Sequence, residues 1–439
     1  MDISYTPLLM FLALFVLLTL GIPIAFALCF VSIVTAWSLW GFGAISILTS
    51  AAWGTMNQFP LVAIALFVYM AFILQKIEVV GDLYDALYKW FGGVRGGLAV
   101  TSIIVGAIIG AISGVVAAGV IGLGLIALPQ MLKYGYNRNI SLGSVLAGGT
   151  LGQIIPPSTI MVIYGTVTNV SIGALFAGGM SCGFFLAGIY SAYILIRSWL
   201  NKDLCPAIAI DERLTLLEKI KNSKGVLAPI CLIIFVLGSV FSGATTPTEA
   251  AGAGCFGALL IGLYNRRLSW TIAAESAWET LGITAMVAWI IIGATAFGSV
   301  FAGTGGNQLV INMAASIPGG KIGVLVVGCM FIFFLGMFLD TGAVVMIAAP
   351  ILSGVMTKMG VNPLLWGLIF LMLLQTAYIS PPVGLSLFYL KGIVSDKISI
   401  KDIYQSTPHF LLLQILGIIL VLLFPTIGLF LPRLFGFNF

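Results

Sequence analysis

Two proline pairs inside long apolar stretches are the residues with the clearest chemical potential. Pro156-Pro157 interrupts the stretch 141–168, and Pro381-Pro382 interrupts the stretch 363–393, 225 positions later. Consecutive prolines remove two backbone donors and prevent a regular helix across the break. A broken helix exposes carbonyl oxygens, which suit a hard monovalent cation, and N–H groups, which suit an anionic group. A packing kink explains one such pair equally well, but the recurrence favours a binding site.

Two shorter interruptions accompany these breaks. Ser113-Gly114 separates two apolar stretches, and Asp340-Thr341-Gly342 separates two others. The first interruption is alternatively explained by close helix packing through small residues. A carboxylate at membrane depth, such as Asp340, is a functional candidate by default, but it can equally cap the following helix, and both roles are compatible. The candidate sodium- and solute-binding residues at the breaks and interruptions are Ser113, Gly114, Gly152, Gln153, Pro156, Pro157, Ser158, Asp340, Thr341, Gly342, Thr376, Ser380, Pro381, Pro382 and Gly384.

A second acidic residue, Glu249, follows Thr246 and Pro247 at the start of the apolar stretch 247–264. An acid in the first turn of a helix interacts favourably with the helix dipole. We therefore favour a helix-start role for Thr246 and Glu249 over a role in ion coupling, which remains the alternative.

The composition determines the class of protein. The 439 residues are 60% hydrophobic and only 8% charged, with a net charge of +5. A soluble protein of this size could not keep so much apolar surface away from water. The composition therefore predicts an all-α polytopic membrane protein and excludes a disordered chain, a nucleic-acid-binding protein and a disulfide-stapled secreted domain. Six cysteines without a CxxC pair and a single histidine argue against a zinc site, and we expect no cofactor apart from coupling ions.

The stretches that flank the two short interruptions are short for membrane spans. A span needs about 20 residues to cross about 30 Å of hydrocarbon. The stretches 97–112 and 115–132 together read as a re-entrant hairpin (97–132), and 322–338 with 341–357 as a second one (322–357). Each hairpin is followed by a broken helix that contains a proline pair. Hairpins paired with broken helices are typical of secondary transporters.

The two halves of the chain are related by an internal repeat. The first repeat is expected at 1–200 and the second at 225–439, joined by a basic linker at 201–224, which we place in the cytoplasm because Lys and Arg favour that side. Counting spans outward from the linker predicts that the two halves have inverted topologies, with one hairpin entering from each face. The residues that recur 225 positions later are Gly81, Met131, Lys133, Gly135, Asn137, Pro156, Pro157 and Tyr164, as Gly306, Met356, Lys358, Gly360, Asn362, Pro381, Pro382 and Tyr389.

The remaining elements suggest a division into a fixed and a moving part. The stretch 76–95 mixes charged and apolar residues and reads as an amphipathic helix at the membrane interface, and 306–320 should do the same on the other side. We expect a transport domain at 97–168 and 322–393. The scaffold is then expected at 1–60, 171–199, 225–303 and 408–435.

The chain resembles the large membrane subunit of tripartite ATP-independent periplasmic (TRAP) transporters, the DctM-like permeases, over essentially its whole length. The motifs that carry the resemblance include Gly149–Ser158, Thr246–Ala250, Leu339-Asp340 and Ser380-Pro381-Pro382.

The resemblance implies a sodium-coupled importer of a small organic acid or related solute, which works by an elevator movement in the bacterial inner membrane. It also implies two protein partners: a periplasmic substrate-binding protein and a separate small membrane subunit of four helices. Val115 and Val116 follow the first tip where many members carry Ser or Thr, so the sodium ligands are expected to be largely backbone carbonyls.

Three other functions are compatible with a polytopic chain. An ion channel would need a pore-lining ring motif, which the sequence lacks. An intramembrane hydrolase would need a Ser-His or Asp-Asp pair at depth, but His409 lies at a segment boundary and Asp340 has no evident acidic partner, so the chain is not expected to be an enzyme. A passive, non-transporting scaffold subunit would not need two symmetric helix breaks.

Overall fold

The computed structural model describes residues 5–114, 116–208, 215, 218–219, 224–395 and 397–437. Every regular element in this part of the chain is helical, as predicted. Within it, six helices are long and apolar enough to cross a membrane, and a seventh span is possible if the bent pair Phe42–Met56 and Pro60–Lys76 counts as one. The protein is therefore an all-α, multi-pass membrane protein. Three of the six helices belong to the two expected hairpins, so length alone does not separate a span from a re-entrant segment.

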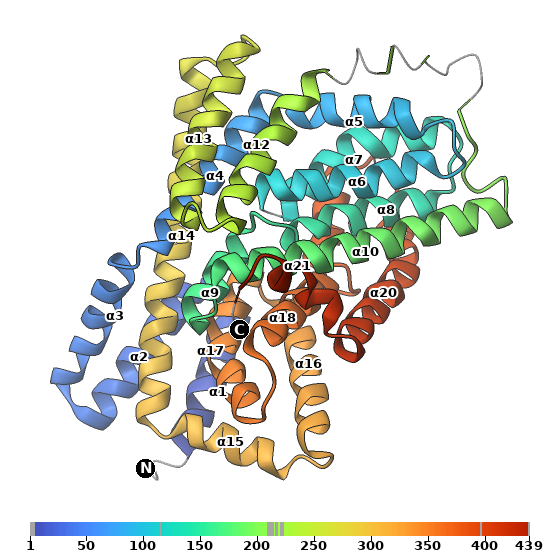
Figure 1. Ribbon diagram of the computed structural model, residues 1–439. Helices are drawn as coiled ribbons and strands as arrows, with labels where there is room; N and C mark the ends of the chain where they lie inside the picture. Colours follow the sequence, from blue (N-terminus) through green and yellow to red (C-terminus); the bar gives the residue numbers. More distant parts are fainter. Residues whose placement is uncertain are drawn as a thin grey trace.

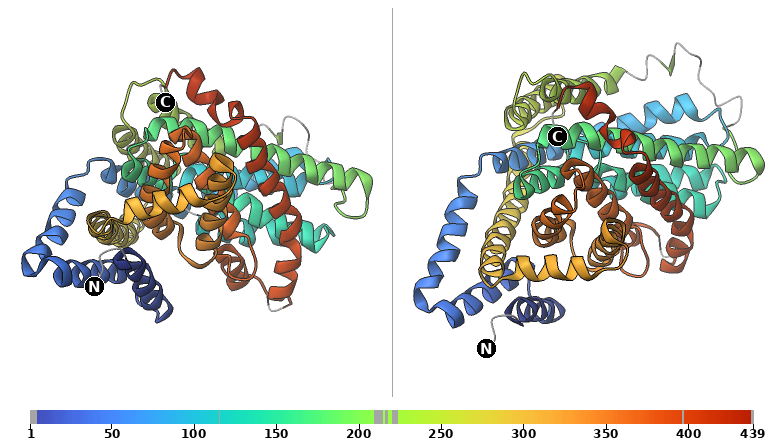
Figure 2. Two further views of the ribbon diagram at one scale, coloured as in Figure 1. Left: turned by 90° about the horizontal axis from the view of Figure 1, so that it is seen from below. Right: turned by 60° about the horizontal axis from the view of Figure 1, so that its bottom comes forward.

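The helices form two groups, which Figure 1 shows on opposite sides of the molecule and Figure 2 shows from two further directions. In the outer group, α14 runs the full height of one side and contacts α2, α3 and α4, while α13 packs against α4 and α12. The helices of this group are α1 (Thr6–Thr19), α2 (Ile24–Trp40), α3 (Ser46–Met56), α4 (Pro60–Lys76), α12 (Lys224–Phe241), α13 (Pro247–Tyr264) and α14 (Trp270–Gly303), with the short 3-10 helix η2 (Phe42–Ile45) before α3.

The inner group holds the two hairpins and the two broken helices. Its elements are α6 (Gly97–Ser113), α7 (Val116–Lys133), α8 (Arg138–Thr150), η3 (Leu151–Gln153), α9 (Thr159–Thr168), α10 (Ile172–Leu200), α16 (Gly320–Phe338), α17 (Thr341–Lys358), α18 (Pro363–Tyr378), α19 (Leu385–Ile393), α20 (Ile400–Leu423) and α21 (Thr426–Leu434). The helices α6 and α7 pack against α8, and α16 and α17 pack against α18. Both proline pairs lie between helices, in the short connections after η3 and after α18.

Two helices that we expected in the scaffold pack with the inner group instead. The helix α10 contacts α6, α18, α20 and α21, and α20 contacts α8, α10 and α18. The reason lies in small residues: Gly179 and Gly183 of α10 leave no space for a side chain because Met161, Ile154 and Ile155 of the first broken helix fill it. The placement of 171–199 and 408–435 in the outer group is therefore wrong.

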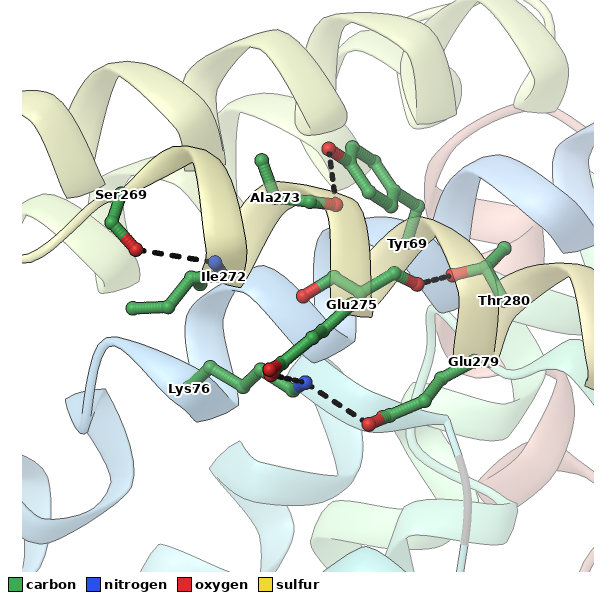
Figure 3. Close-up of polar contacts among 9 residues, drawn as sticks. Tyr69, Lys76, Ser269, Ile272, Ala273, Glu275, Glu279 and Thr280 are labelled. Atoms are coloured by element: carbon green, nitrogen blue, oxygen red, sulfur yellow. Dashed lines mark hydrogen bonds and ion pairs between the residues drawn. The ribbon is translucent and has the colours of Figure 1, made fainter.

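The helix α14 also differs from its expected extent. The apolar stretch of this part of the sequence is 280–303, which predicts a helix start at residue 280. The helix begins at Trp270, where the Ser269 side chain accepts a hydrogen bond from the Ile272 N–H. The first turns of the helix contain Glu275 and Glu279, and these charged residues interrupt the hydropathy pattern from which the helix was predicted. Both carboxylates bind Lys76 at the end of α4, at 2.9 and 3.0 Å, and Figure 3 shows the ammonium between them.

Two amphipathic helices connect the groups, close to where the sequence predicted them: α5 (Val79–Phe91) and α15 (Gly306–Ser316). Glu78, in the left-handed conformation at φ 61°, turns the chain from α4 into α5. Arg267, in the connection before α14, donates to the Ile77 carbonyl at 3.0 Å and to Asp82 at 2.7 Å. Together with Lys76, this contact fixes the start of α5 against the outer group. Exposed ion pairs of this kind add little stability, so their main effect is on position.

Candidate functional site

The first hairpin tip lies directly on the first helix break. Gly114 ends α6 at φ +59°, and a Cβ atom at this position would lie 2.9 Å from the Pro157 carbonyl oxygen. The Thr159 hydroxyl donates to the Gly114 carbonyl at 3.2 Å. The side chain of Ser113 and the whole of Val115 lie outside the described residues. The candidate residues of the first tip and the first break are thus brought together as one cluster.

Pairs of glycines beside this cluster bring α6 of the hairpin into contact with α8 and η3 of the broken helix. Gly106 faces Gly148, and Gly110 faces Gly152, with their backbones in direct contact. A Cβ atom on Gly152 would lie 2.5 Å from the Gly110 Cα, so neither position accepts a side chain. Close packing through small residues, the alternative explanation of the first tip, is therefore present beside it. It holds the hairpin and the broken helix together.

The first break is a buried loop that contains polar groups without hydrogen-bond partners among the described residues. Residues 151–158 are all buried, and the Pro156-Pro157 bond is cis. The Ser158 hydroxyl donates to the Gln153 carbonyl at 2.8 Å, which closes the loop. No donor among the described residues reaches the carbonyl oxygens of Ile155, Pro156 or Pro157. The Gln153 side-chain amide, only 2% exposed, also has no partner for either its oxygen or its nitrogen.

The second tip is bound to the end of α18 by Tyr378. Asp340 caps α17 by accepting the Gly342 N–H at 2.9 Å, and its other oxygen accepts the Tyr378 hydroxyl at 2.9 Å. The same tyrosine oxygen accepts from the Thr341 hydroxyl at 2.7 Å and from the Thr341 N–H at 3.3 Å. The capping role considered for Asp340 is therefore present. Its carboxylate is solvent-exposed, which leaves it accessible for a second role.

The second break resembles the first in its chemistry. The Pro381-Pro382 bond is cis, and Gly384 has no room for a side chain because Tyr378 and Ser380 backbone atoms surround its Cα. Thr376 donates to the Met372 carbonyl at 2.8 Å, so its oxygen remains free to accept. The Ser380 hydroxyl is buried and has no hydrogen-bond partner among the residues that are described. The Pro382 carbonyl accepts from the Tyr404 hydroxyl at 2.7 Å.

The two breaks meet through an exchange of helices. The helix α9, which follows the first break, packs against α17 of the second hairpin, and α19, which follows the second break, packs against α7 of the first. The helix α18 also contacts η3. Each half of the chain therefore completes the surroundings of the other half's break.

Thr246 and Glu249 lie in a different place. They form a capping box at the start of α13: Glu249 accepts the Thr246 N–H at 2.7 Å, and Thr246 accepts the Glu249 N–H at 3.3 Å. The helix α13 packs against α4 and α12 of the outer group. The structure thus shows the helix-start role that we favoured.

Two polar residues of the site were not singled out from the sequence. Tyr378 holds the second tip, and Gln375, fully buried in the last turn of α18, has an amide without partners. The internal repeat contained a signal for Tyr378, because it stands 225 positions after Gln153 and is its counterpart in the second half. Gln375 lay inside an apolar helix, where a single amide is usually taken as part of the core.

The donor set at the breaks fits a hard monovalent cation such as sodium. The available ligands are neutral oxygens: the Ser380 hydroxyl and the backbone carbonyls that no donor among the described residues reaches. Oxygen ligands of this kind suit hard cations. No group of His, Cys, Asp or Glu side chains that could hold a metal ion occurs in the described ranges, so the donors do not suit a transition metal.

The comparison with known proteins agrees with this geometry. The family model of the tripartite ATP-independent periplasmic transporter, DctM component, matches residues 11–427. The chain is 30% identical to the ectoine/5-hydroxyectoine TRAP transporter large permease protein UehC of Ruegeria pomeroyi, over 97% of this chain and 98% of that one. It is 27% identical to the sialic acid TRAP transporter large permease protein SiaM of Vibrio cholerae, over 95% and 96% of the two chains.

Solved structures of transporters share the fold. The YdaH transporter of Alcanivorax borkumensis superposes with a TM-score of 0.63 at 14% identity, over 97% of this chain and 98% of that one. The antimetabolite efflux pump MtrF of Neisseria gonorrhoeae superposes with a TM-score of 0.59 at 13% identity, over 91% and 86% of the two chains. The family model extends over nearly the whole length of the chain, and the paired tips and breaks agree with it. The chain therefore belongs to the DctM family, the large permease subunits of TRAP transporters for organic solutes.

Proposed function

We propose that this permease imports a small organic acid or a related solute together with sodium across the bacterial cytoplasmic membrane. The observation that carries the proposal is the pair of helix breaks, the first fully buried and the second partly exposed at its prolines. Each break has neutral oxygens without a partner among the described residues, and each lies in the group that holds a hairpin tip. Sodium bound at the breaks would satisfy these oxygens. Sodium bound at a break would also favour the closed state of the hairpin tip beside that break. This link would couple sodium binding to solute binding.

The movement in this proposal is an elevator movement of the inner group against the outer group, and the two halves act as inverted repeats. The grouping supports this idea because α10 and α20 pack with the hairpins, which makes the inner group a large body. The arms α5 and α15 join the two groups at opposite ends of the molecule in Figure 1. They are placed to guide such a movement while α4 and α14 stay fixed.

The proposal includes two partner proteins. A periplasmic substrate-binding protein delivers the solute, and a small four-helix membrane subunit extends the outer group. One relative, the isethionate permease protein DctMQ of Oleidesulfovibrio alaskensis, is longer than this chain, which covers 59% of its length.

Uptake in proteoliposomes tests the sodium coupling. The permease is reconstituted with its small subunit and supplied with its loaded binding protein, and solute uptake is measured with an inward sodium gradient. We expect uptake to stop when potassium replaces sodium outside. The variant Ser380→Ala, which removes one unpaired hydroxyl, should raise the sodium concentration needed for half-maximal uptake, whereas Ser299→Ala on α14, whose hydroxyl bonds to the Thr295 carbonyl, should not. Uptake that proceeds unchanged without a sodium gradient would contradict the coupling.

A further inference from the structure

We propose that the solute is net neutral, a zwitterion or a comparable polar molecule, and that the side-chain amides of Gln153 and Gln375 bind it. The inference rests on the proposed function and narrows its solute class. It follows from two observations that are independent of each other: unpaired buried amides at the breaks, and the signs of the charges around the site.

The first observation is the state of the two amides. Gln153 is 2% exposed and Gln375 is fully buried, and neither the oxygen nor the nitrogen of either side chain has a hydrogen-bond partner in the part of the chain that the structure describes. A buried amide without partners is costly, and apolar side chains of similar size would avoid that cost. The two residues lie on η3 and α18, which are in contact beside the breaks. A ligand that bonds to both amides would remove the cost in the working transporter.

The chemistry of an amide indicates what such a ligand carries. Each glutamine side chain offers two N–H donors and one accepting oxygen. The donors suit a carboxylate and the acceptor suits a cationic or polar N–H group, so a pair of amides matches a molecule that carries both. No Asp, Glu, Lys, Arg or His side chain is buried among the described residues, so apart from the coupled sodium the core supplies no charge to balance that of a solute. Transfer of an unbalanced charge from water into such a site is strongly unfavourable.

The second observation is an acidic cavity that reaches the first tip. It has a volume of about 420 Å³ and lies between the α4–α5 connection and the first hairpin. One wall carries Glu78, Asp82 and Asp85, and the other includes Ile112 and Ala118, on either side of the tip. Arg267 binds Asp82, but no salt bridge to Glu78 or Asp85 occurs in the part of the chain that is described. A cavity with this excess of negative charge repels an anion and admits a neutral or cationic molecule.

Thermal unfolding of the purified full-length permease in detergent, with sodium present, tests the inference. A ligand that binds the folded state raises the midpoint of unfolding. The probes are ectoine and proline, which are net neutral and carry both a carboxylate and an N–H group, and succinate and malate, which are dianions at neutral pH. We expect a concentration-dependent rise in Tm with at least one net-neutral probe at millimolar concentrations and none with the dianions.

Two variants and a matched control assign the binding to the amides. Gln153→Leu and Gln375→Leu should each abolish the solute-induced rise, while the unliganded Tm stays the same or increases because an unpaired amide is removed. The control is Gln414→Leu on α20, because this amide is also fully buried without partners. It should keep the solute-induced rise. A preserved sodium-induced rise in Tm shows that each variant is folded.

The outcomes separate this inference from the proposed function. A rise with succinate or malate that equals or exceeds that with the neutral probes overturns the inference, as does the absence of any rise with the neutral probes. A full solute-induced rise in both glutamine variants overturns the role of the amides. By contrast, a neutral solute that binds equally well in sodium and in potassium contradicts sodium coupling and leaves the solute class intact.

Discussion

The hydroxyl of Tyr378 is predicted to keep the second hairpin tip closed. In Tyr378→Phe, the ring stays and three contacts disappear: with the Asp340 carboxylate at 2.9 Å, the Thr341 hydroxyl at 2.7 Å and the Thr341 N–H at 3.3 Å. A hydrogen bond to a charged group contributes about 1.5–3 kcal/mol, and a buried group left without a partner costs about 1–3 kcal/mol. Because Asp340 is exposed and regains water, we take the low end of both ranges.

Together these effects destabilise the closed tip by about 2–3 kcal/mol. At 1.36 kcal/mol for each factor of ten, the equilibrium shifts about 30- to 150-fold toward the open tip. Hydrogen exchange measures this equilibrium directly, because local opening exposes the N–H groups of Thr341 and Gly342. We expect a peptide that spans these residues to exchange faster by about this factor, and a peptide from α14 to keep its rate.

Tyr389→Phe is the matched control. Tyr389 is a partly buried tyrosine on α19 whose hydroxyl makes no hydrogen bond to the described residues. It should leave the exchange of the tip peptide unchanged. Equal exchange in wild type and Tyr378→Phe, or equal acceleration in both variants, would refute the assignment of the closing contact to Tyr378.

Three further substitutions have distinct expected results. Asp340→Asn keeps an oxygen that can accept the Gly342 N–H, so Tm should change little. The sodium dependence of uptake should shift. A wild-type sodium dependence would mean that Asp340 only caps α17. Gly152→Ala places a Cβ atom 2.5 Å from the Gly110 Cα, so we expect folding stability to fall by about 1–3 kcal/mol. The loss should appear as a lower Tm in detergent, and an unchanged Tm would contradict the backbone contact. Glu249→Ala removes one side of the capping box and should lower Tm slightly, with unchanged sodium dependence of uptake. Altered sodium dependence would support the ion-coupling alternative.

The elements bounded by local signals were predictable from the sequence. The helices Ile24–Trp40 and Pro247–Tyr264 have the bounds of their apolar stretches, because Pro23 with Gly41, and Pro247 with Asn265, mark their ends. The two breaks were found for the same reason, since consecutive prolines act through their own backbone. The capping role of Asp340 and the helix start at Glu249 also follow from short-range spacing.

The features that depend on distant partners were not predictable in the same way. The first turns of α14 look polar until Lys76 is known to form an ion pair with both Glu275 and Glu279. The place of α10 depends on what faces Gly179 and Gly183, and a glycine in an apolar helix does not reveal its neighbour. Tyr378 contacts a tip 38 positions earlier, and only the repeat connects it with Gln153.

The exchange of helices between the halves has a consequence for biosynthesis. The surface of α9 that packs against α17 is made early in translation, but its partner emerges only after residue 341 has left the ribosome. Until then, the first half carries an incomplete interface into the bilayer, and α7 waits even longer for α19. Chains with such exposed intermediate surfaces misassemble readily. We therefore expect the first half to acquire these contacts only after the second half has entered the membrane.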